Sequence, residues 1–316
     1  MEYLEFEKST LKAISDKIEE YQKLDSDGDL DDKIKIQQEK YHSELKKLYS
    51  KLTSWQKTQV ARHPQRPHAI DIIDELIEDY IPLAGDRVFA EDAAIIGGLG
   101  RFNNRPVMVI GQEKGHDTDS RIKHNFGMPR PEGYRKAQRL MQMAAQFKLP
   151  ILTFVDTAGA WPGIDAEERG QSEAIAKSIA TCLSVETPMI ATIVGEGGSG
   201  GAIALAAGNK VNMLEHSIYS VITPEGCASI LWRDAAKAKE AAEALRFTAQ
   251  DLKKLELIDV VIKEPVGAAH RDKKAAIGNI RKVVEGQLAE LENFDGQTLK
   301  EQRRDKFLAM GKHGLS

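Results

Sequence analysis

The chain has 316 residues, of which 41% are hydrophobic and 29% are charged, and its formal net charge is −4. This composition supports one large globular domain or two ordinary ones, and it argues against general binding of nucleic acid. No apolar run approaches the roughly 18 residues of a membrane helix, and the acidic first residues do not resemble a signal peptide. Only two cysteines occur, Cys182 and Cys227, and they fit neither a zinc site nor a disulfide framework. We therefore expect a cytoplasmic protein with no metal site in this chain.

Residues 1–60 carry two apolar stripes at helical spacing. One stripe runs from Leu4 to Leu24 and the other from Ile34 to Trp55, in steps of three, four or seven residues. This pattern predicts an N-terminal helical hairpin. Each stripe covers only about three heptads, so we expect the hairpin to rest on another body or to form a subunit contact.

The turn between the stripes, residues 25–32, imitates the start of a calcium-binding EF-hand loop. Leu30 stands where that loop needs glycine, and Ile36 stands where it needs a bidentate glutamate. We therefore predict a polar turn without calcium.

The segment His63-Pro-Gln-Arg-Pro-His68 interrupts the helical pattern twice. It predicts a junction, with residues 1–68 as hairpin and junction and residues 69–316 as the main domain. The main domain is expected to begin with a helix over Ala69–Tyr80.

Strands and helices then alternate, which predicts an α/β fold with a largely buried parallel sheet. Ala94–Phe102 and Pro106–Gly111 flank Asn103-Asn104, which is typical of a β-hairpin and suggests repeated β-β-α units. The later expected elements are a helix over Glu132–Phe147, a strand over Pro150–Val155, a helix over Glu167–Val185, a strand over Met189–Val194, a strand region over Val211–Ile222, helices over Glu225–Trp232 and Ala235–Leu245, a helical tail from Asp272 and a frayed end over Gly311–Ser316.

The segment Met189–Gly208 contains a run of glycines between an expected strand and an expected helix. Four of the six residues from Gly195 to Gly200 are glycine, and Gly201–Ala207 predicts a short apolar helix. The first N–H groups of a helix have no intrahelical partner, and the helix dipole adds positive charge there. Without side chains in the way, an oxygen that carries negative charge can approach closely.

Two motif interpretations of this segment assign it to well-known enzyme classes. Gly195-x-Gly197-x-x-Gly200 matches a dinucleotide-binding fingerprint, although the following helix is short for that fold. Ser199 within Gly197-x-Ser199-x-Gly201 matches the nucleophile elbow of a serine hydrolase. A hydrolase would also need a downstream histidine, for which His216 and His270 are the candidates.

A third interpretation is an oxyanion hole made only of backbone, because a glycine pair at a helix start directs two N–H groups toward one oxygen. The plain structural alternative is that the glycines allow close packing of helix and sheet. Motif spacing alone leaves all four possibilities open.

Six motifs in order along nearly the whole chain resemble the α subunit of bacterial acetyl-CoA carboxylase carboxyltransferase. They are His63-Pro-Gln-Arg-Pro67, Asn125-Phe-Gly-Met-Pro129, Pro131-Glu-Gly-Tyr-Arg-Lys136, Ala166-Glu-Glu-Arg-Gly-Gln-Ser-Glu-Ala174, Gly195-Glu-Gly-Gly-Ser-Gly-Gly-Ala202 and Ser220-Val-Ile-Thr-Pro-Glu-Gly-Cys-Ala-Ser-Ile-Leu-Trp232. One departure is Ala158, where the family commonly has proline. The resemblance implies a crotonase-like α/β fold, a spiral of β-β-α units with an N-terminal helical hairpin and C-terminal helices.

The resemblance further implies carboxyl transfer from carboxybiotin on a separate carrier protein to acetyl-CoA, giving malonyl-CoA. In such a subunit Gly200 and Gly201 would donate backbone N–H groups to the biotin ureido oxygen. Gly197, Gly198 and Ser199 would be cofactor-binding residues, and Gly197 and Gly198 would shape the turn. The implied partners are a carboxyltransferase β subunit in an α2β2 assembly, a biotin carboxyl carrier protein and biotin carboxylase, with no membrane and no nucleic acid. The alternative is a self-contained crotonase-type acyl-CoA enzyme or a hydrolase using Ser199.

Six basic residues lie between positions 121 and 139, where Glu132 is the only acid. They are Arg121, Lys123, Arg130, Arg135, Lys136 and Arg139. Such a cluster could bind the phosphates of coenzyme A or an acidic partner surface, and a solvated helix face is an equal alternative.

Overall fold

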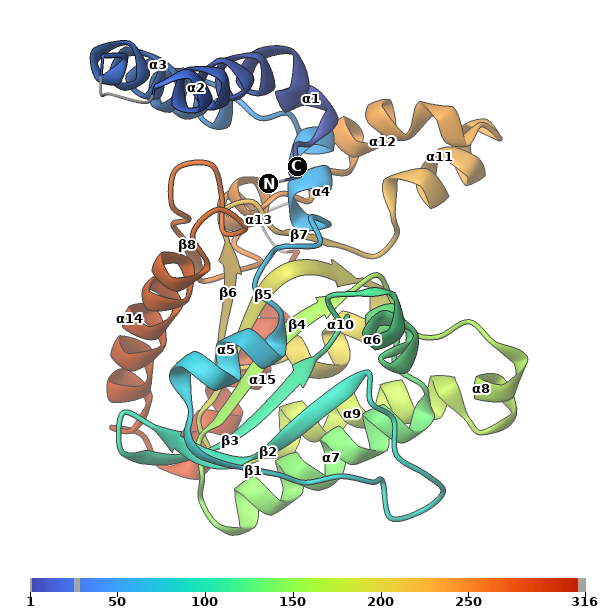
Figure 1. Cartoon of the computed structure of the whole chain (residues 1–316). Helices are drawn as coiled ribbons and strands as arrows, with labels where there is room; N and C mark the ends of the chain where they lie inside the picture. The colour runs from blue at the N-terminus through green and yellow to red at the C-terminus, as the bar shows by residue number, and fades with distance from the viewer. Residues whose placement is uncertain (1, 26–28, 312–316) are drawn as a thin grey trace.

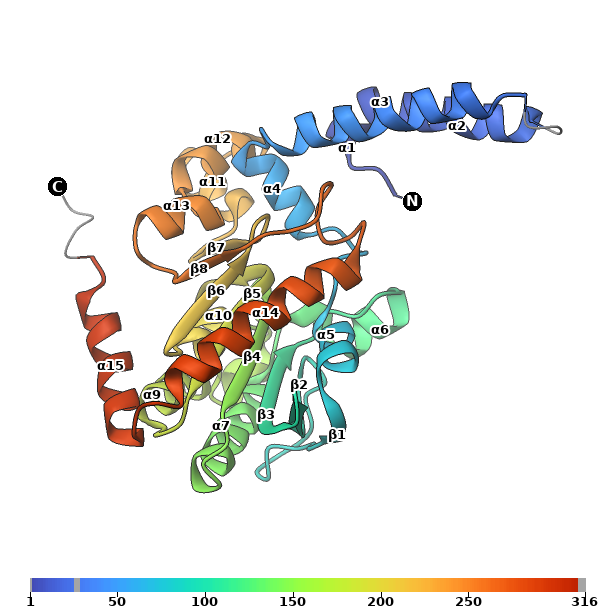
Figure 2. The same cartoon turned by 90° about the vertical axis from the view of Figure 1, so that its left-hand side faces the viewer.

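The computed structural model describes residues 2–25 and 29–311. They form a body of three layers, in which helices cover both faces of one sheet, and a pair of helices extends from this body (Figures 1 and 2). Helices α5 (Ala69–Leu76) and α14 (Lys273–Leu291) cover one face of the sheet, and α7 (Pro131–Gln146), α9 (Gln171–Ser184) and α10 (Ser199–Ala206) cover the other. The predicted α/β architecture is confirmed.

The described residues contain one sheet of eight strands in the order β1-β2-β3-β4-β5-β6-β8, and β7 also pairs with β5. Strands β1, β2 and β3 pair antiparallel, and all the other pairs are parallel. The strands are β1 (Glu78–Pro82), β2 (Ile95–Phe102), β3 (Arg105–Gln112), β4 (Ile151–Thr157), β5 (Met189–Gly198), β6 (Lys210–Leu214), β7 (Ile218–Ser220) and β8 (Val260–Ile262).

The predicted β-hairpin is confirmed as β2 and β3, which pair in register from Ile95 to Phe102. Asn103 and Asn104 have φ angles of 50° and 63°, which fit a two-residue hairpin turn with both residues in the left-handed region. Asparagine tolerates this conformation better than most residues, so the turn explains the dipeptide.

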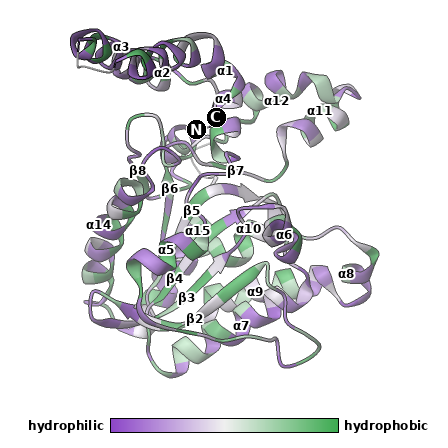
Figure 3. Ribbon diagram, in the orientation of Figure 1, coloured by the Kyte–Doolittle hydropathy of each residue, from purple (hydrophilic) through white to green (hydrophobic). Residues whose placement is uncertain are grey.

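The inner strands are apolar on both faces because helices bury both faces of the sheet. On β4, Leu152 and Phe154 pack with α5 and α14, whereas Ile151 and Val155 pack with α7, α9 and α10. Figure 3 shows the same pattern as hydrophobic colour along the strands. Continuous apolar runs are the expected signature of strands buried in this way.

The N-terminal helical hairpin is confirmed as α2 (Ala13–Leu24) and α3 (Asp31–Tyr49), which lie side by side and extend away from the body (Figure 2). Apolar side chains near its base are buried, such as Leu11 and Leu45, whereas Leu24 and Ile36 are 65% and 60% exposed. Residues 26–28 of the predicted polar turn, like residues 312–316 of the predicted frayed end, lie outside the described residues.

The remaining helices include those that connect this hairpin to the body. They are α1 (Glu5–Glu7), the π-helix η1 (Lys8–Lys12), α4 (Ser54–Ala61), α6 (Thr118–Lys123), η2 (Asn125–Gly127), α8 (Ile164–Glu168), α11 (Pro224–Trp232), η3 (Ala235–Lys237), α12 (Ala238–Leu245), α13 (Ala249–Lys254) and α15 (Gly296–Ala309). Arg66 in the predicted junction is buried within the body. The division of the chain at residue 68 stays a prediction.

Several predicted elements are wrong in extent. The helix expected to reach Tyr80 ends at Leu76, because the chain then pairs with β2 as strand β1. The long helix expected over Glu167–Val185 is two helices, separated at Gly170, whose φ is +81°. The strand region expected over Val211–Ile222 is β6 and β7, joined by a turn.

The C-terminal helix α15 is held to the body by Arg303, whose side chain is completely buried. Its guanidinium donates hydrogen bonds to the carbonyl oxygens of Cys182, Val185 and Thr187 and to the amide oxygen of Asn209. Burial lowers the pKa of Arg303 to about 10. The guanidinium thus satisfies its donors with neutral oxygens. Two ion pairs, Lys300 with Glu186 and Lys306 with Asp259, join α15 to the body as well.

Candidate functional site

The glycine-rich turn lies where β5 ends and α10 begins. The strand was expected to end at Val194, but it continues to Gly198 because residues 196–198 pair with β7. Helix α10 starts at Ser199 instead of Gly201. The change of direction falls on Ser199, whose φ of +55° is unusual for a residue other than glycine.

The start of α10 presents free backbone N–H groups. Gly198 is the N-cap residue and has no side chain that could accept from them. Gly200 and Gly201 follow within the first turn of the helix, where N–H groups have no intrahelical partner. The turn therefore offers two neighbouring donors, strengthened by the helix dipole, to an oxygen that carries negative charge.

The loop after β4 packs so tightly on this turn that side chains are excluded. A Cβ atom added to Gly198 would lie 2.2 Å from the carbonyl oxygen of Ala158, and one added to Gly201 would lie 2.9 Å from the amide nitrogen of Ala160. A Cβ added to Gly200 would meet only the Ile175 side chain, at 3.2 Å. Close packing of the glycines thus occurs at the helix start, where the N–H groups have no intrahelical partner.

An apolar pocket of about 280 Å³ lies beside the turn, with Ser199 in its wall. Its remaining lining residues are Ile203, Ala206, Val211, Tyr219, Ser220, Val221, Leu252, Leu257, Phe307 and Met310. This pocket can hold the apolar part of a ligand next to the donors of α10.

A buried charge cluster lies on the other side of the turn and centres on Glu196. The Lys114 Nζ atom lies 2.8 Å from both Glu196 and Asp156, and the Arg62 Nε atom lies 2.6 Å from Glu196. Burial alone would raise the pKa of Glu196, but Lys114 and Arg62 lower it to about 2. Burial likewise acts to lower the pKa of Lys114, and the two carboxylates raise it instead. Glu196 is therefore an ionised carboxylate that pairs with two cations, Lys114 and Arg62.

Gln112 was missed by the sequence interpretation, although it joins three parts of the site. Its side-chain amide donates to the carbonyl oxygen of Gly201 at 2.8 Å and accepts from the backbone N–H of Asp156 at 3.2 Å. Asp156 in turn accepts from the backbone N–H of Glu196 at 2.9 Å. One sequence signal could have identified these residues as part of the site: Gln112 and Asp156 are polar residues near the carboxyl ends of buried strands.

The triad predicted for a serine hydrolase is not assembled. The His216 ring packs edge-on against Tyr49, and the His270 ring stacks on His63 with 4.0 Å between the ring centres. Within residues 2–25 and 29–311, no hydrogen bond joins Ser199 to a histidine. The dinucleotide interpretation would also need an acidic residue about 20 positions after Gly195. Glu215 stands there, and it forms an ion pair with Lys263 at 2.8 Å.

The basic residues 121–139 do not form one continuous basic surface. Four of them are engaged by other parts of the chain: Arg130 pairs with Asp165, Arg135 with Asp86 and Glu132, Lys136 with Glu91, and Arg139 donates to the carbonyl oxygens of Gly85 and Ala84. The cluster therefore mainly fixes α7 to its surroundings, and its proposed role in binding phosphate stays a prediction for Arg121 and Lys123.

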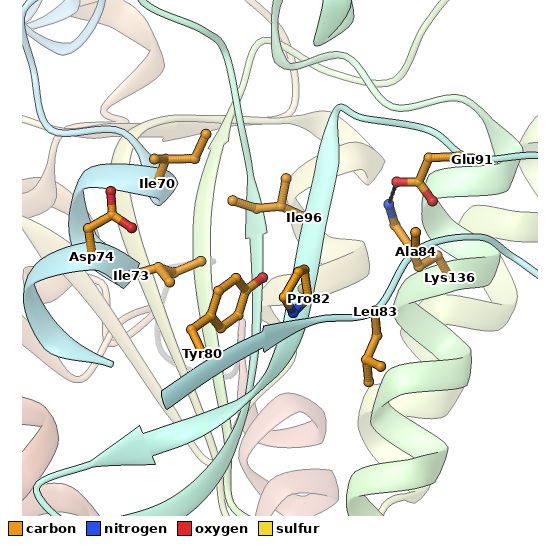
Figure 4. Close-up of a pocket in the computed structure, with 11 residues that line it drawn as sticks. Ile70, Ile73, Asp74, Tyr80, Pro82, Leu83, Ala84, Glu91, Ile96 and Lys136 are labelled. Atoms are coloured by element: carbon orange, nitrogen blue, oxygen red, sulfur yellow. Dashed lines mark hydrogen bonds and ion pairs between the residues drawn. The ribbon is translucent and has the colours of Figure 1, made fainter. Parts of the chain in front are cut away.

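A second pocket, also of about 280 Å³, lies between α5 and the β1–β2 edge of the sheet (Figure 4). Ile70, Ile73 and Ile96 form its apolar wall, and the pair between Lys136 and Glu91 closes one end. None of the glycines predicted to form the site lines this pocket.

In the part of the chain that the structure describes, no helix is long and apolar enough to cross a membrane. The same residues contain no cluster of three or more histidine, cysteine or acidic side chains that could hold a metal ion. Cys182 and Cys227 are both buried as free thiols, and burial raises the pKa of Cys182 to about 12.

The fold is that of known carboxyltransferases. A transcarboxylase 12S structure with bound methylmalonyl-coenzyme A and methylmalonic acid has a TM-score of 0.60 and 17% identity over 72% of this chain and 42% of that chain. The β subunit of geranyl-CoA carboxylase from Pseudomonas aeruginosa has a TM-score of 0.55 and 17% identity over 76% of this chain and 46% of that chain. This chain thus spans less than half of each of these proteins, and its body has the crotonase-like fold of this class.

Sequence comparison defines the family more closely. The model of the family "Acetyl co-enzyme A carboxylase carboxyltransferase-like" matches residues 3–311. The acetyl-coenzyme A carboxylase carboxyl transferase subunit alpha of Paramagnetospirillum magneticum is 60% identical over 318 residues, covering 100% of both chains. The chain belongs to the family of carboxyltransferase α subunits of acetyl-CoA carboxylase.

Proposed function

We propose that this chain transfers a carboxyl group from biotin on a carrier protein to acetyl-CoA and so forms malonyl-CoA, the first committed step of fatty acid synthesis. The observation that carries the proposal is the pair of backbone N–H groups of Gly200 and Gly201 at the start of α10. The 60% identity to a carboxyltransferase α subunit over its full length supports the same conclusion.

In this proposal the N–H groups of Gly200 and Gly201 bind the biotin ureido oxygen. Gly198 allows the close approach of β5 to the loop after β4, Gly197 leaves room for the Tyr219 side chain, and Ser199 makes the turn. The fit to biotin rests on two N–H groups without an intrahelical partner at the start of α10 and on the apolar pocket that Ser199 lines. When bound, carboxybiotin supplies the carboxyl group and, once that group has left, the base for the acetyl methyl group. This chain then needs no side-chain nucleophile, which agrees with the absence of a histidine bonded to Ser199 among the described residues.

A carboxyltransferase α subunit requires a β subunit as its partner, and we propose an α2β2 assembly. The remaining proposed partners are a biotin carboxyl carrier protein and biotin carboxylase, in the cytoplasm. The substrate is a coenzyme A thioester, whose enolate oxygen is expected to bind the β subunit. The alternative of a self-contained crotonase-type enzyme or Ser199 hydrolase predicts thioester turnover by this chain alone.

The test measures malonyl-CoA decarboxylation with a free biotin derivative as acceptor, for the chain alone and with a matching β subunit. Gly200→Pro removes one N–H donor, and proline is tolerated in the first turn of a helix. Gly200→Ala is the matched control, because it keeps the N–H and its added methyl group meets only the Ile175 side chain, at 3.2 Å, which has to shift by a few tenths of an ångström. Loss of one such donor is expected to lower kcat by about 100- to 1,000-fold.

Activity only with the β subunit, retained by Gly200→Ala and lost by a folded Gly200→Pro chain, would support the proposal. Thioester turnover by the chain alone, without biotin, would contradict it and favour the alternative.

A further inference from the structure

Strand β5 contains a bulge immediately before the glycine turn. Val155 of β4 lies opposite Ile193 of β5, and Thr157 lies opposite Gly197. Three residues of β5, 194–196, therefore face the single residue Asp156 on β4. A bulge leaves backbone groups without ladder partners and changes the direction of the strand, and bulges are frequent beside active sites. The direction in which α10 starts depends on how this bulge is held.

Arg66 holds the first residue of the bulge. Its Nε and Nη2 atoms donate to the carbonyl oxygen of Val194 at 3.1 and 2.8 Å. The same guanidinium pairs with both carboxylate oxygens of Glu264, at 2.9 and 2.8 Å, and both side chains are almost completely buried. A guanidinium fixed on two sides in this way has one orientation, so the position of Val194 is fixed as well.

Arg62 holds the last residue of the bulge. Its Nε atom donates to the Glu196 carboxylate at 2.6 Å, and its Nη1 and Nη2 atoms donate to the Glu225 carboxylate at 2.6 and 3.3 Å. Lys114 holds the other oxygen of Glu196 at 2.8 Å. The Glu196 side chain is therefore held between two cations that come from different parts of the chain.

Both arginines come from the segment that follows α4, the connection between the N-terminal hairpin and the body. Arg62 is the C-cap residue of α4, and Arg66 lies four residues further on. They contact residues 194 and 196, two apart on β5, and Gly200 and Gly201 follow within a few residues. The N-terminal segment thus supplies part of the support of the site instead of serving only as a connection.

We propose that Arg62 and Arg66 are positioning residues for carboxyl transfer: they hold the β5 bulge and thereby orient the N–H groups of Gly200 and Gly201. This inference rests on the proposed function of those two groups. Neither arginine touches a reacting atom in this assignment. Their effect is on geometry, and a displacement of about 1 Å at a reacting centre can lower a rate about 100-fold.

Arg62 is the better residue to vary. Removal of Arg66 would leave Glu264 as a buried charge without its cation and would destabilise the fold. Removal of Arg62 leaves Glu196 paired with Lys114, and the Arg62 side chain is 31% exposed. Glu225→Gln is the matched control, because it weakens the other contact of Arg62 and leaves the contact with Glu196 unchanged.

The experiment uses the complete complex with the β subunit and measures kcat and KM for biotin-dependent decarboxylation of malonyl-CoA. Arg62→Gln is expected to lower kcat by about 10- to 100-fold with the KM for malonyl-CoA unchanged. Arg62→Lys is expected to recover part of the loss, since an ammonium group can still pair with Glu196. Glu225→Gln should stay within about threefold of the wild type. Glu196→Gln keeps the side-chain shape and weakens both ion pairs, so it should reproduce the loss of kcat. This variant tests the inference if the Arg62→Gln chain does not assemble with the β subunit.

An assembled Arg62→Gln complex with wild-type kcat and only a lower melting temperature would overturn the inference. Equal losses for Arg62→Gln and Glu225→Gln would also overturn it, because the important contact would then be with α11. A wild-type complex without biotin-dependent turnover would instead refute the proposed function itself.

Discussion

The carbonyl oxygen of Ala158 lies where the side chain of residue 198 would begin, only 2.2 Å from an added Cβ atom of Gly198. Neither backbone can yield easily, because Gly198 pairs with Ser220 of β7 and Thr157 pairs with Gly197. The end of β5 and the loop after β4 therefore have a fixed separation. The glycines of the turn therefore differ in how well they would accept a side chain: residue 198 would meet backbone, whereas residue 200 would meet only the Ile175 side chain.

Gly198→Ala should lower both stability and activity, whereas Gly200→Ala should be tolerated. Overpacking in a well-packed region costs about 1–3 kcal/mol, and here it also separates the turn from its neighbouring loop. Urea unfolding and biotin-dependent decarboxylation measure the two effects. Equal behaviour of the two variants would show that the packing at Ala158 is not restrictive.

Ser199→Ala should retain biotin-dependent activity within about threefold. The Ser199 hydroxyl has no hydrogen-bond partner among the described residues, and the role proposed for the residue is to make the turn. Ser199→Gly should be slightly more stable than wild type, because a non-glycine residue at φ +55° is strained by about 1 kcal/mol. A loss of activity greater than 100-fold in Ser199→Ala would point back to a serine nucleophile.

Arg303→Met should destabilise the chain by about 2–4 kcal/mol, since several buried carbonyl oxygens would lose their donor together. Arg304→Met on the same helix is the matched control, because Arg304 is exposed. Urea unfolding measures both free energies. Similar values for the two variants would mean that α15 is held by its apolar contacts alone.

The stability of the chain should fall as the pH decreases below about 6.5, and His270 should contribute to this loss. Burial, together with His63 and Arg66, lowers the pKa of His270 to about 2. The unfolded chain then binds a proton that the folded chain does not, at any pH between these values. The contribution of His270 is complete above pH 6.5 and is lost at about 1.4 kcal/mol per pH unit below it.

His270→Phe keeps an aromatic ring against His63 and cannot titrate. Its free energy of unfolding should therefore decrease less than that of wild type between pH 7.5 and pH 5.5, by about 1.4 kcal/mol. His42→Gln, on the exposed surface of α3, is the control and should follow wild type. Parallel curves for His270→Phe and wild type would refute the assignment to His270.

Leu231→Asp should weaken assembly with the β subunit. Ile230 and Leu231, which are consecutive on α11, are 71% and 64% exposed, and exposed apolar side chains that lie together are typical of an interaction surface. Leu308→Asp on α15 replaces an equally exposed leucine elsewhere and should not affect assembly. Sedimentation of the mixed subunits measures the dissociation constant, which we expect to rise at least about tenfold for Leu231→Asp alone.

Local sequence signals predicted much of the fold. The Asn103-Asn104 turn and the alternating apolar runs identified the hairpin and the layers because these features depend on neighbouring residues. The end of α5 could not be found in this way. No glycine or proline marks Leu76, and the change to strand β1 comes from pairing with β2. Gly170, by contrast, was an available signal for the break between α8 and α9.

The predicted site residues were four glycines and Ser199 of one short segment, and they lie together because they are neighbours in the sequence. Their supporting residues are distant in sequence. Arg66 lies 128 residues from Val194 and 198 from Glu264, and nothing near Arg66 identifies these partners. The segment around it could be interpreted only as a break between helices, because the pairing depends on the folded sheet.

The separation between Arg66 and Glu264 has a consequence for synthesis of the chain. A ribosome has made residues 62–66 long before β5, and β5 before Glu264. A nascent chain can form the helical hairpin early, but the β5 bulge lacks its complete support until the last quarter of the chain has emerged. A product of translation that ends between Gly201 and Glu264 therefore contains the glycine turn without the Arg66–Glu264 pair that supports it, and we expect such a polypeptide to be inactive.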